Sequence, residues 1–587
     1  MNALLFRSAL AAILLLVPNF RSAGDEAATF RKLLDTEWEY TMEHAPEWAS
    51  SLGDRRWNDR WGDLSTGTFE QEAGHHRELL RQLEQIDRTK LPPTDRVNYD
   101  LKKYQTQLAL DEYGQRLWTM PLNQREGIQL LDDFADSLRF QTVKDYEDWI
   151  ARLRALPTVM DQTIALLRMG IAEKRTHARV VLDGVPAQIA KQIVEKPEES
   201  PFYKPFQKFA TDISPADRER LSATAKEAIA KQVIPAYKQF SEFFNKEYLP
   251  ACTEQAGAWQ WPNGDATYAF LARKFTTTTL TPDEIHNIGL REVDRITQEM
   301  QKIMDQVGWK GTKQEFFEDL RHNPKFYYHS QEELLEGYRA VAKRIDPTLV
   351  KVLKVLPRIP YGVEPIPAAA APNTTAAYYR PPAADGSRAG TFFVNLYRPP
   401  MRPKYEMMAL ALHEAVPGHH MQFAVAFDQS ALPNFRRYGG EGKYTAYIEG
   451  WALYAESLGD ELDLYEDPYS KFGQLTYEIW RACRLVVDTG IHSKHWTRQQ
   501  AIDYVLDHSA KTVLDVENEI DRYISWPGQA LAYKIGQLKI KELRDRAKAA
   551  LGEKFDVRDF HQIVLQSGPV PLDVLEQNVD EWIRANK

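Results

Sequence analysis

The spacing of apolar residues is the feature that most constrains the fold, and over most of the chain it is the spacing of a helix. Apolar side chains recur every three or four residues, with charges between them, in residues 69–86, 146–174, 215–249 and 281–307. Two helix starts are readable, because Ser214-Pro215 and Thr281-Pro282 each combine a capping hydroxyl with a first-turn proline. The pattern predicts a mainly α protein.

The helical pattern is interrupted between residues 356 and 403. This stretch is rich in proline, alanine and glycine, and it contains one clear strand, residues 390–397, just after the turn signal Asp385-Gly386. We expect a single helical unit over residues 25–587, made of an N-terminal part (25–355) and a second part (356–587) with a small β element. The N-terminal helices are expected to form the opposite wall of a cleft.

Composition narrows the partners and the compartment. The formal net charge is −9 and no block of basic residues stands out, so no nucleic-acid partner is expected. Residues 1–24 have the pattern of a Sec-type signal peptide: Arg7 precedes an apolar run at 9–17, and cleavage is expected near Gly24. The run is too short for a stable membrane span, although a buried helix or a short anchor is the alternative. The predicted location is periplasmic or secreted.

The segment His-Glu-Ala-Val-Pro-Gly-His-His, which begins at His413, offers the donors of a zinc site. The common H-E-x-x-H motif places two histidines one helical turn apart, but here the fourth residue after His413 is Pro417. On an unbroken helix the later histidines would lie too far from His413 to share one ion. Pro417 and Gly418 can break the helix and return a later histidine to the face of His413. Helix geometry leaves both His419 and His420 open as this second ligand.

A surface histidine cluster at a kinked helix is the alternative to a metal site. The residues before His413 are apolar, which predicts burial, and buried histidine and glutamate groups without a metal would be costly. Cys252 and Cys483 are too few for a disulfide framework or a thiolate-rich zinc site, and a bond between them stays open. A metal is therefore expected to use histidine and carboxylate ligands.

A second apolar segment, residues 447–456, carries two acids. Glu449 is the expected third ligand, because the glycine that follows it permits close approach. Glu456 lies seven residues further, on a similar face, and is expected to hold one of the histidines through a hydrogen bond. A solvated position on an amphipathic helix is the alternative, and it suits Glu456 better than Glu449.

Three motifs, at residues 382–392, 413–422 and 449–456, resemble those of a widespread bacterial family that is catalogued as a domain of unknown function and grouped with gluzincin-type metallopeptidases. The resemblance extends over nearly the whole mature chain. It implies a large, helical, deep-cleft zincin fold of the neurolysin type, similar to thimet oligopeptidase, angiotensin-converting enzyme and carboxypeptidase Taq. It implies no particular substrate. The family motif agrees at His413, Glu414, Gly418, His419, His420 and Glu449. The segment is longer than the motif of the better-known peptidases, so His420 stays an alternative ligand. The resemblance favours His419, because it aligns with the Gly-His pair of their motif.

Together these residues predict a zinc-dependent peptidase for short peptides, either a carboxypeptidase or an oligopeptidase. His413, His419 and Glu449 are expected to hold zinc, and Glu414 is expected to act as the general base. A donor to the oxyanion is expected from the C-terminal helices, where the candidates are His492, Arg522, Tyr523, Tyr533 and Lys534. Tyrosine and histidine serve in the similar peptidases, so Tyr523 and Tyr533 are preferred; core packing is their alternative.

The strand at 390–397 is expected to be an edge strand that pairs with an extended peptide through Gly390 and its neighbours, with Asn395 adding a side-chain bond. Three arginines are candidates for binding a substrate C-terminal carboxylate: Arg388, Arg481 and Arg484. Pairing of the last two with Glu478 or Asp488 along a helix is an equal alternative.

Two other functions remain open from the sequence. The metal site would also suit a hydrolase of another amide or an ester, and the scaffold would suit a periplasmic binding protein without turnover. Glu414 argues against the second, because a pure binder needs no base beside the metal. A serine hydrolase finds no support, since no G-x-S-x-G motif is present. The oligomeric state is not predicted.

Overall fold

The computed structural model describes residues 23–368, 371–384, 386, 388–439 and 442–587. The predicted signal peptide lies outside these residues except for Ala23 and Gly24, which begin the first helix. Within the described ranges, no helix has both the length and the apolarity that crossing a membrane requires.

The N-terminal part is helical, as its apolar spacing predicts. Its helices are α1 (Ala23–His44), α2 (Pro46–Ser51), α3 (Thr66–Glu84), α4 (Pro93–Gln115), α5 (Val143–Ala172), α6 (Val185–Lys191), α7 (Pro215–Ala228), α8 (Ile234–Phe243), α9 (Leu249–Ala251), α10 (Gly264–Thr276), α11 (Pro282–Gln306), α12 (Lys313–His322) and α13 (Gln331–Ile345). The caps at Ser214 and Thr281 are confirmed: each hydroxyl accepts an amide hydrogen bond from the third residue of its helix. Two π-turns join α7, α8 and α9 into one continuous helical run.

The proline-rich stretch contains a three-stranded sheet rather than a single strand. Its strands are β1 (Tyr361–Pro365), β2 (Ala377–Arg380) and β3 (Gly390–Val394), in the order β1-β3-β2. β1 is parallel and β2 antiparallel to β3. The prediction missed β1 and β2 because both are short and flanked by prolines, which favour loops.

Helices return after the sheet, as predicted. They are α14 (Met407–Glu414), α15 (His419–Asp428), α16 (Asn434–Arg437), α17 (Thr445–Ser457), α18 (Pro468–Ser493), α19 (Arg498–His508), α20 (Val513–Ser525), α21 (Ala532–Leu551), α22 (Val557–Gln566) and α23 (Leu572–Asn586). Cys252 and Cys483 are buried and free, so they form no disulfide. The mainly α prediction is confirmed.

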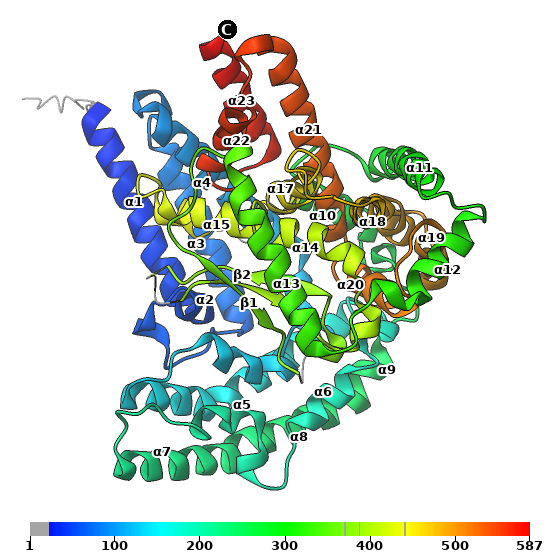
Figure 1. Cartoon of the computed structure of the whole chain (residues 1–587). Coiled ribbons are helices and arrows are strands. Elements are labelled where there is room, and N and C mark those ends of the chain that lie inside the picture. Colours follow the sequence, from blue (N-terminus) through cyan, green and yellow to red (C-terminus); the bar gives the residue numbers. More distant parts are fainter. Residues whose placement is uncertain (1–22, 369–370, 385, 387, 440–441) are drawn as a thin grey trace, which may run out of the picture.

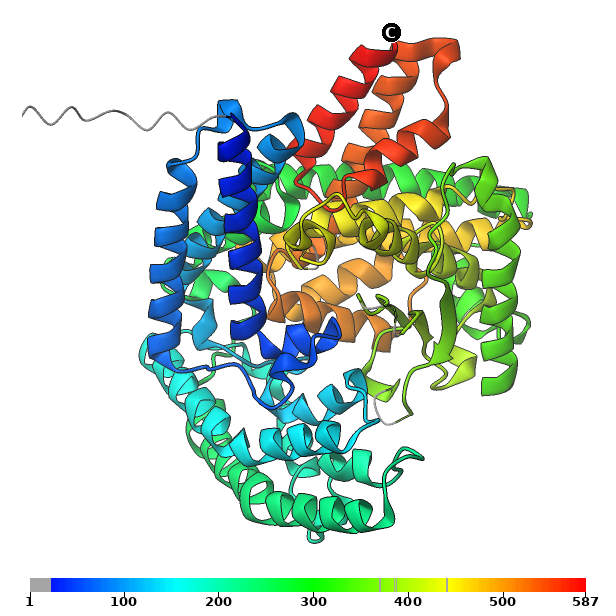
Figure 2. The same ribbon diagram turned by 90° about the vertical axis from the view of Figure 1, so that its left-hand side faces the viewer.

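The helices that carry the candidate metal ligands lie in the middle of the molecule. In Figures 1 and 2, α14, α15 and α17 are surrounded by the N-terminal helices on one side, α5–α9 below, and α21–α23 above. α17 packs along α21, and their backbones meet at Gly450 and Gly536, where an added Cβ on Gly450 would lie 2.5 Å from Gly536. The glycine after Glu449 therefore fixes the position of α17 against α21, and with it the position of Glu449.

Candidate metal centre

The His413 segment folds as two helices joined by a tight turn, residues 415–418. α14 ends at Glu414 and α15 begins at His419, so the helix is broken at the predicted place. Gly418 is required by close approach: a Cβ there would lie 1.9 Å from the carbonyl oxygen of His413. The turn folds the second helix back, so that His419 faces His413 instead of lying two turns along the same axis.

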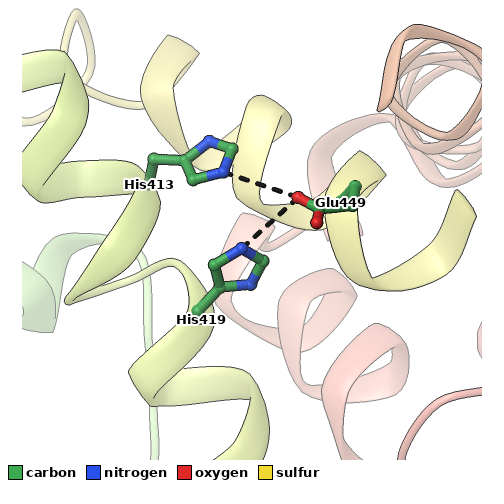
Figure 3. A group of neighbouring side chains, drawn as sticks. All are labelled: His413, His419 and Glu449. Atoms are coloured by element: carbon green, nitrogen blue, oxygen red, sulfur yellow. Dashed lines mark ion pairs between the residues drawn. The ribbon is translucent and has the colours of Figure 1, made fainter. Parts of the chain in front are cut away.

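Three side chains converge on one point between α14, α15 and α17 (Figure 3). Nε2 of His413 and Nε2 of His419 lie 3.5 and 3.4 Å from the same oxygen, Oε2 of Glu449. The two imidazole rings are nearly perpendicular, with centroids 4.9 Å apart. One ligand atom from each of the three residues lies within 4.8 Å of the others. They are the three residues that the sequence predicts as ligands.

Glu456 sets the orientation of the His413 ring. Nδ1 of His413 donates to Oε1 of Glu456 at 2.8 Å, and the glutamate side chain is fully buried. Because this bond occupies Nδ1, Nε2 is left to face Glu449 and His419. Arg481 lies behind the pair, with Nη2 3.6 Å from the same carboxylate oxygen. Glu456 thus occupies the supporting position that the sequence predicts for it.

The electrostatics of the centre favour a cation. Burial disfavours the charged form of His413, but hydrogen bonds with Glu449 and Glu456 and the charge of Glu414 outweigh it and raise the His413 pKa to about 9. Burial likewise opposes ionisation of Glu449, yet the charge of His419 and the hydrogen bonds with both histidines hold the Glu449 pKa well below its usual range. The carboxylates of Glu414, Glu449 and Glu456 thus act together on His413, and their negative charge favours a cation at this place.

The donor set fits a zinc ion. Two imidazole nitrogens and one carboxylate are the ligands of a catalytic zinc site, which keeps a further coordination position open. Nε2 of both histidines already faces the shared Glu449 oxygen, and Glu456 supplies the carboxylate that usually supports a zinc-bound histidine.

His420 is directed away from this centre, although it directly follows His419. Its Nδ1 lies 2.8 Å from the hydroxyl of Tyr379 on β2, and its ring packs 4.9 Å from that of Tyr361 on β1. Burial lowers its pKa to about 4, which keeps the ring neutral. His420 therefore joins the turn to the sheet, and of the two alternatives it is His419 that the fold places beside His413.

A cavity of about 620 Å³ opens beside the three ligands. Its wall includes the ligands themselves, the carboxylate of Glu414, residues 375–379 on and before β2, and side chains of α18, α20 and α21. The N-terminal part contributes Arg125, Glu126 and Phe275. The centre therefore lies at the wall of a pocket large enough for a few residues of a peptide.

The sequence of the chain matches a known protein family. The bacterial family of unknown function DUF885 matches residues 46–579. The chain belongs to this family. None of the curated proteins matches it.

Two solved structures resemble this DUF885 protein over nearly their whole length. A protein described as "the putative lipoprotein from Colwellia psychrerythraea" is 30% identical, covers 96% of this chain and 100% of its own, and superposes with a TM-score of 0.88. A "putative lipoprotein of unknown function from Shewanella oneidensis" is 17% identical, covers 95% and 99%, and has a TM-score of 0.65. The second likeness shows the fold alone.

Of the five candidate oxyanion donors, two line the cavity and three are buried outside its lining. Tyr533 lines the cavity, and its ring stacks 6.5 Å from that of His413. The Tyr523 hydroxyl is buried, accepting from Nε of Arg484 at 2.7 Å and Nε1 of Trp480 at 3.1 Å.

His492 is buried, and the main chain occupies both of its nitrogens: Nδ1 accepts from the amide of Ala258, and Nε2 donates to the carbonyl of Tyr523. The prediction of His492 as a donor to the oxyanion needs correction, because neither nitrogen is available. Arg522 lines the cavity with Tyr533. Lys534 is buried in ion pairs with Glu292 and Glu478.

Two of the three predicted carboxylate-binding arginines line the cavity. Arg481 and Arg484 project from α18 into its wall, and the partner of Arg484 is Glu519 on α20, at 2.9 Å. The alternative that these arginines pair with Glu478 or Asp488 is wrong, because helix packing supplies other partners. Arg388 donates to the carbonyl of Pro381 and is not among the residues that line the cavity.

The prediction of β3 as a substrate-binding edge strand is wrong. β3 is the central strand of the sheet, so both of its edges are already paired. Gly390 is buried, and an added Cβ would lie 2.3 Å from the Tyr379 hydroxyl. Asn395 is fully buried, and its amide donates to three carbonyls of the loop before β2, those of Ala371, Thr374 and Thr375. Both residues build the sheet and its loop.

Arg125 and Glu519 line the cavity although they are not among the site residues predicted from the sequence. Arg125 lies in an irregular segment nearly 300 residues before the metal ligands, and no local pattern marks it. Glu519 had a weak signal: it lies three and four residues before Arg522 and Tyr523, and therefore on the same face of α20.

The role of Glu456 gives a testable prediction. Replacing Glu456 by alanine is expected to weaken zinc binding about 10- to 100-fold, because the His413 ring loses the bond that orients it. Glu456→Gln keeps an acceptor for Nδ1 and should lose less. Zinc affinity measured by chelator competition checks this. Glu461→Ala, on the exposed glutamate that pairs with Arg544, is the control and should keep wild-type affinity.

Proposed function

We propose that this DUF885 protein is a zinc-dependent peptidase of the gluzincin type that hydrolyses short peptides. The convergence of His413, His419 and Glu449 on one point, with Glu414 on the wall of the same cavity, is the observation that carries the proposal. The resemblance of its motifs to gluzincin-type peptidases supports the same conclusion. Bound zinc would act as a Lewis acid toward the scissile carbonyl and would lower the pKa of the attacking water.

Glu414 is the proposed general base. It is the residue next to His413, at the last position of α14, and it lines the cavity although it is mostly buried. From there it would take a proton from the attacking water and return it to the leaving amine.

Tyr533 is the proposed donor to the oxyanion. Its hydroxyl accepts a hydrogen bond from Nη2 of Arg522 at 3.0 Å. The hydroxyl proton is therefore free to be donated to a substrate oxygen, and the nearby guanidinium strengthens it as a donor. Stacking against His413 places the ring beside the ligands.

β2 takes the substrate-pairing role that the sequence assigned to β3. It is an edge strand, paired only with β3 among the described strands, and its residues line the cavity. An extended peptide that adds to this edge would be held by backbone hydrogen bonds without regard to its sequence. Such binding suits a peptidase with a broad substrate range.

We also propose that the protein works outside the cytoplasm. The N-terminal 24 residues have the pattern of an export signal, and the similar structure from Colwellia psychrerythraea carries the description of a putative lipoprotein. Short peptides in the periplasm or the surrounding medium are the corresponding substrates.

A digest of a mixed peptide library, read by mass spectrometry, tests the proposal. The zinc-loaded protein is expected to cleave short peptides, either by loss from the C-terminus or by internal cuts. Cleavage of amide or ester substrates without peptide hydrolysis would point to another zinc hydrolase. Tight peptide binding with no cleavage would identify a binding protein and refute the proposal.

A further inference from the structure

One end of the cavity carries three arginines that surround a single buried acid. Arg125, Arg484 and Arg522 all line the cavity, and each lies within 4 Å of Glu519: Arg484 at 2.9 Å, Arg522 at 3.5 Å and Arg125 at 3.9 Å. They come from three distant parts of the chain. We call these four residues the arginine pocket.

The arginine pocket has more positive charge than its acid neutralises. Burial would raise the pKa of Glu519, but the three guanidinium groups outweigh it and hold that pKa to about 2, so the acid stays ionised. One carboxylate against three guanidinium groups leaves an excess of two positive charges. Glu126 also lines the cavity, but it is exposed and its carboxylate accepts from Trp526 at 2.7 Å.

Donor groups in the pocket remain unused. Nη1 of Arg484 and Nε of Arg522 are buried and have no hydrogen-bond partner among the described residues. The side chain of Arg484 is only 3% exposed. A buried guanidinium with unsatisfied N–H groups is costly, and the planar oxygens of a carboxylate are the acceptors that match an arginine side chain.

Tyr533 connects the pocket to the metal centre. The guanidinium of Arg484 lies 4.2 Å from the centroid of the Tyr533 ring, and the His413 ring lies 6.5 Å from the same centroid. The guanidinium is thus no further from His413 than about three extended residues can span. An anion bound in the pocket would lie within three residues of a peptide bond at the metal.

We propose that the arginine pocket binds the C-terminal carboxylate of the substrate, so that the enzyme removes one to three residues from the C-terminus. This rests on the proposed peptidase function and specifies its substrate class. A carboxylate is the anion that every unmodified peptide carries at one end, and it matches the fork of donors that arginine presents. An Asp or Glu side chain near the scissile bond offers the same chemistry.

Three versions of one peptide test the proposal: the free acid, the C-terminal amide, and the amide with glutamate as the last residue. The free acid is expected to lose one to three C-terminal residues, with kcat/KM at least about tenfold above that of the plain amide. Recovery of the rate in the glutamate amide would show that the pocket accepts a side-chain carboxylate too. Equal rates for all three peptides would overturn the proposal.

A binding measurement separates this proposal from the peptidase function. Zinc-loaded Glu414→Gln protein is expected to bind the free acid at least about tenfold more tightly than the amide in a calorimetric titration. This preference does not require turnover. If the protein cleaves neither peptide but binds the free acid more tightly, the peptidase function is rejected and the carboxylate-binding pocket is retained. If it cleaves the acid and the amide equally well, the pocket is rejected and the peptidase function is retained.

Arg125→Gln is the variant of choice, because this side chain is the most exposed of the three, at 19%. It is expected to reduce the acid-to-amide preference about tenfold, mainly through KM, while the thermal unfolding midpoint stays close to wild type. Arg168→Gln, on an exposed arginine that pairs with Glu247, is the matched control and should leave the preference unchanged. An unchanged preference in folded Arg125→Gln and Arg522→Lys would refute the assignment.

Discussion

Replacing Glu414 by glutamine is expected to lower kcat for peptide cleavage by on the order of 10³-fold while zinc stays bound. The amide is nearly the same size as the carboxylate but cannot take the proton of the attacking water. Glu414 is not one of the three converging ligands, so the metal content should remain at one ion per chain. Steady-state kinetics on one peptide substrate, with elemental analysis of the same preparation, measures both quantities.

Two controls for Glu414→Gln distinguish loss of the general base from loss of the fold or of peptide binding. Glu336→Gln, on an exposed glutamate that pairs with Arg339, should keep full activity. Peptide affinity of Glu414→Gln should change little, because the carboxylate acts on water and not on the peptide backbone. Near-wild-type turnover in the folded, zinc-loaded variant would show that Glu414 is not the base.

Alanine substitution of the three histidines gives the second large effect, and the structure predicts opposite results for two adjacent residues. His413→Ala and His419→Ala are expected to lose zinc and activity, because each removes one of the three proposed protein ligands. The loss in zinc affinity should exceed the roughly 100-fold limit for supporting residues. His420→Ala should keep its zinc, since that ring faces Tyr379 on the sheet.

Metal analysis and thermal unfolding with and without zinc measure this difference. In wild type and His420→Ala, zinc at 100 times its dissociation constant should stabilise the fold by about 2.7 kcal/mol, whereas the two ligand variants should show almost no shift. If His419→Ala keeps zinc and a folded His420→Ala loses it, then His420 is the ligand and His419 is not. Absence of zinc from the wild type would remove the basis of the proposed function.

Much of the fold follows from local patterns in the sequence. The helical spacing and the caps at Ser214 and Thr281 are short-range signals. The structure has α3, α5, α11 and the continuous run from α7 to α9 within a few residues of the predicted bounds. The strands were harder to predict. β1 and β2 are four or five residues long, and their hydrogen bonds go to a partner distant in sequence, so no local period reveals them.

The errors in the predicted site also arise from contacts between residues that are distant in sequence. His492 has a plausible residue type at a plausible place on α18, yet the packing of its neighbours directs both nitrogens to the main chain. Asn395 was assigned to substrate because its strand was expected at an edge, and sheet order reversed that assignment. Arg125 and Glu519 escaped notice because only the tertiary fold brings them to the cavity.

The sequence by itself determined that the chain is mainly helical and that the metal-binding candidates are His413, Glu449 and one of the adjacent histidines His419 and His420. Residue type, spacing and the helix-breaking Pro417-Gly418 pair are covalent properties that no packing can change. The tertiary structure decided which histidine faces the centre, that β2 rather than β3 is the edge strand beside the cavity, and that three arginines surround Glu519. These depend on how distant helices and strands pack, and such contacts leave no periodic trace in the sequence.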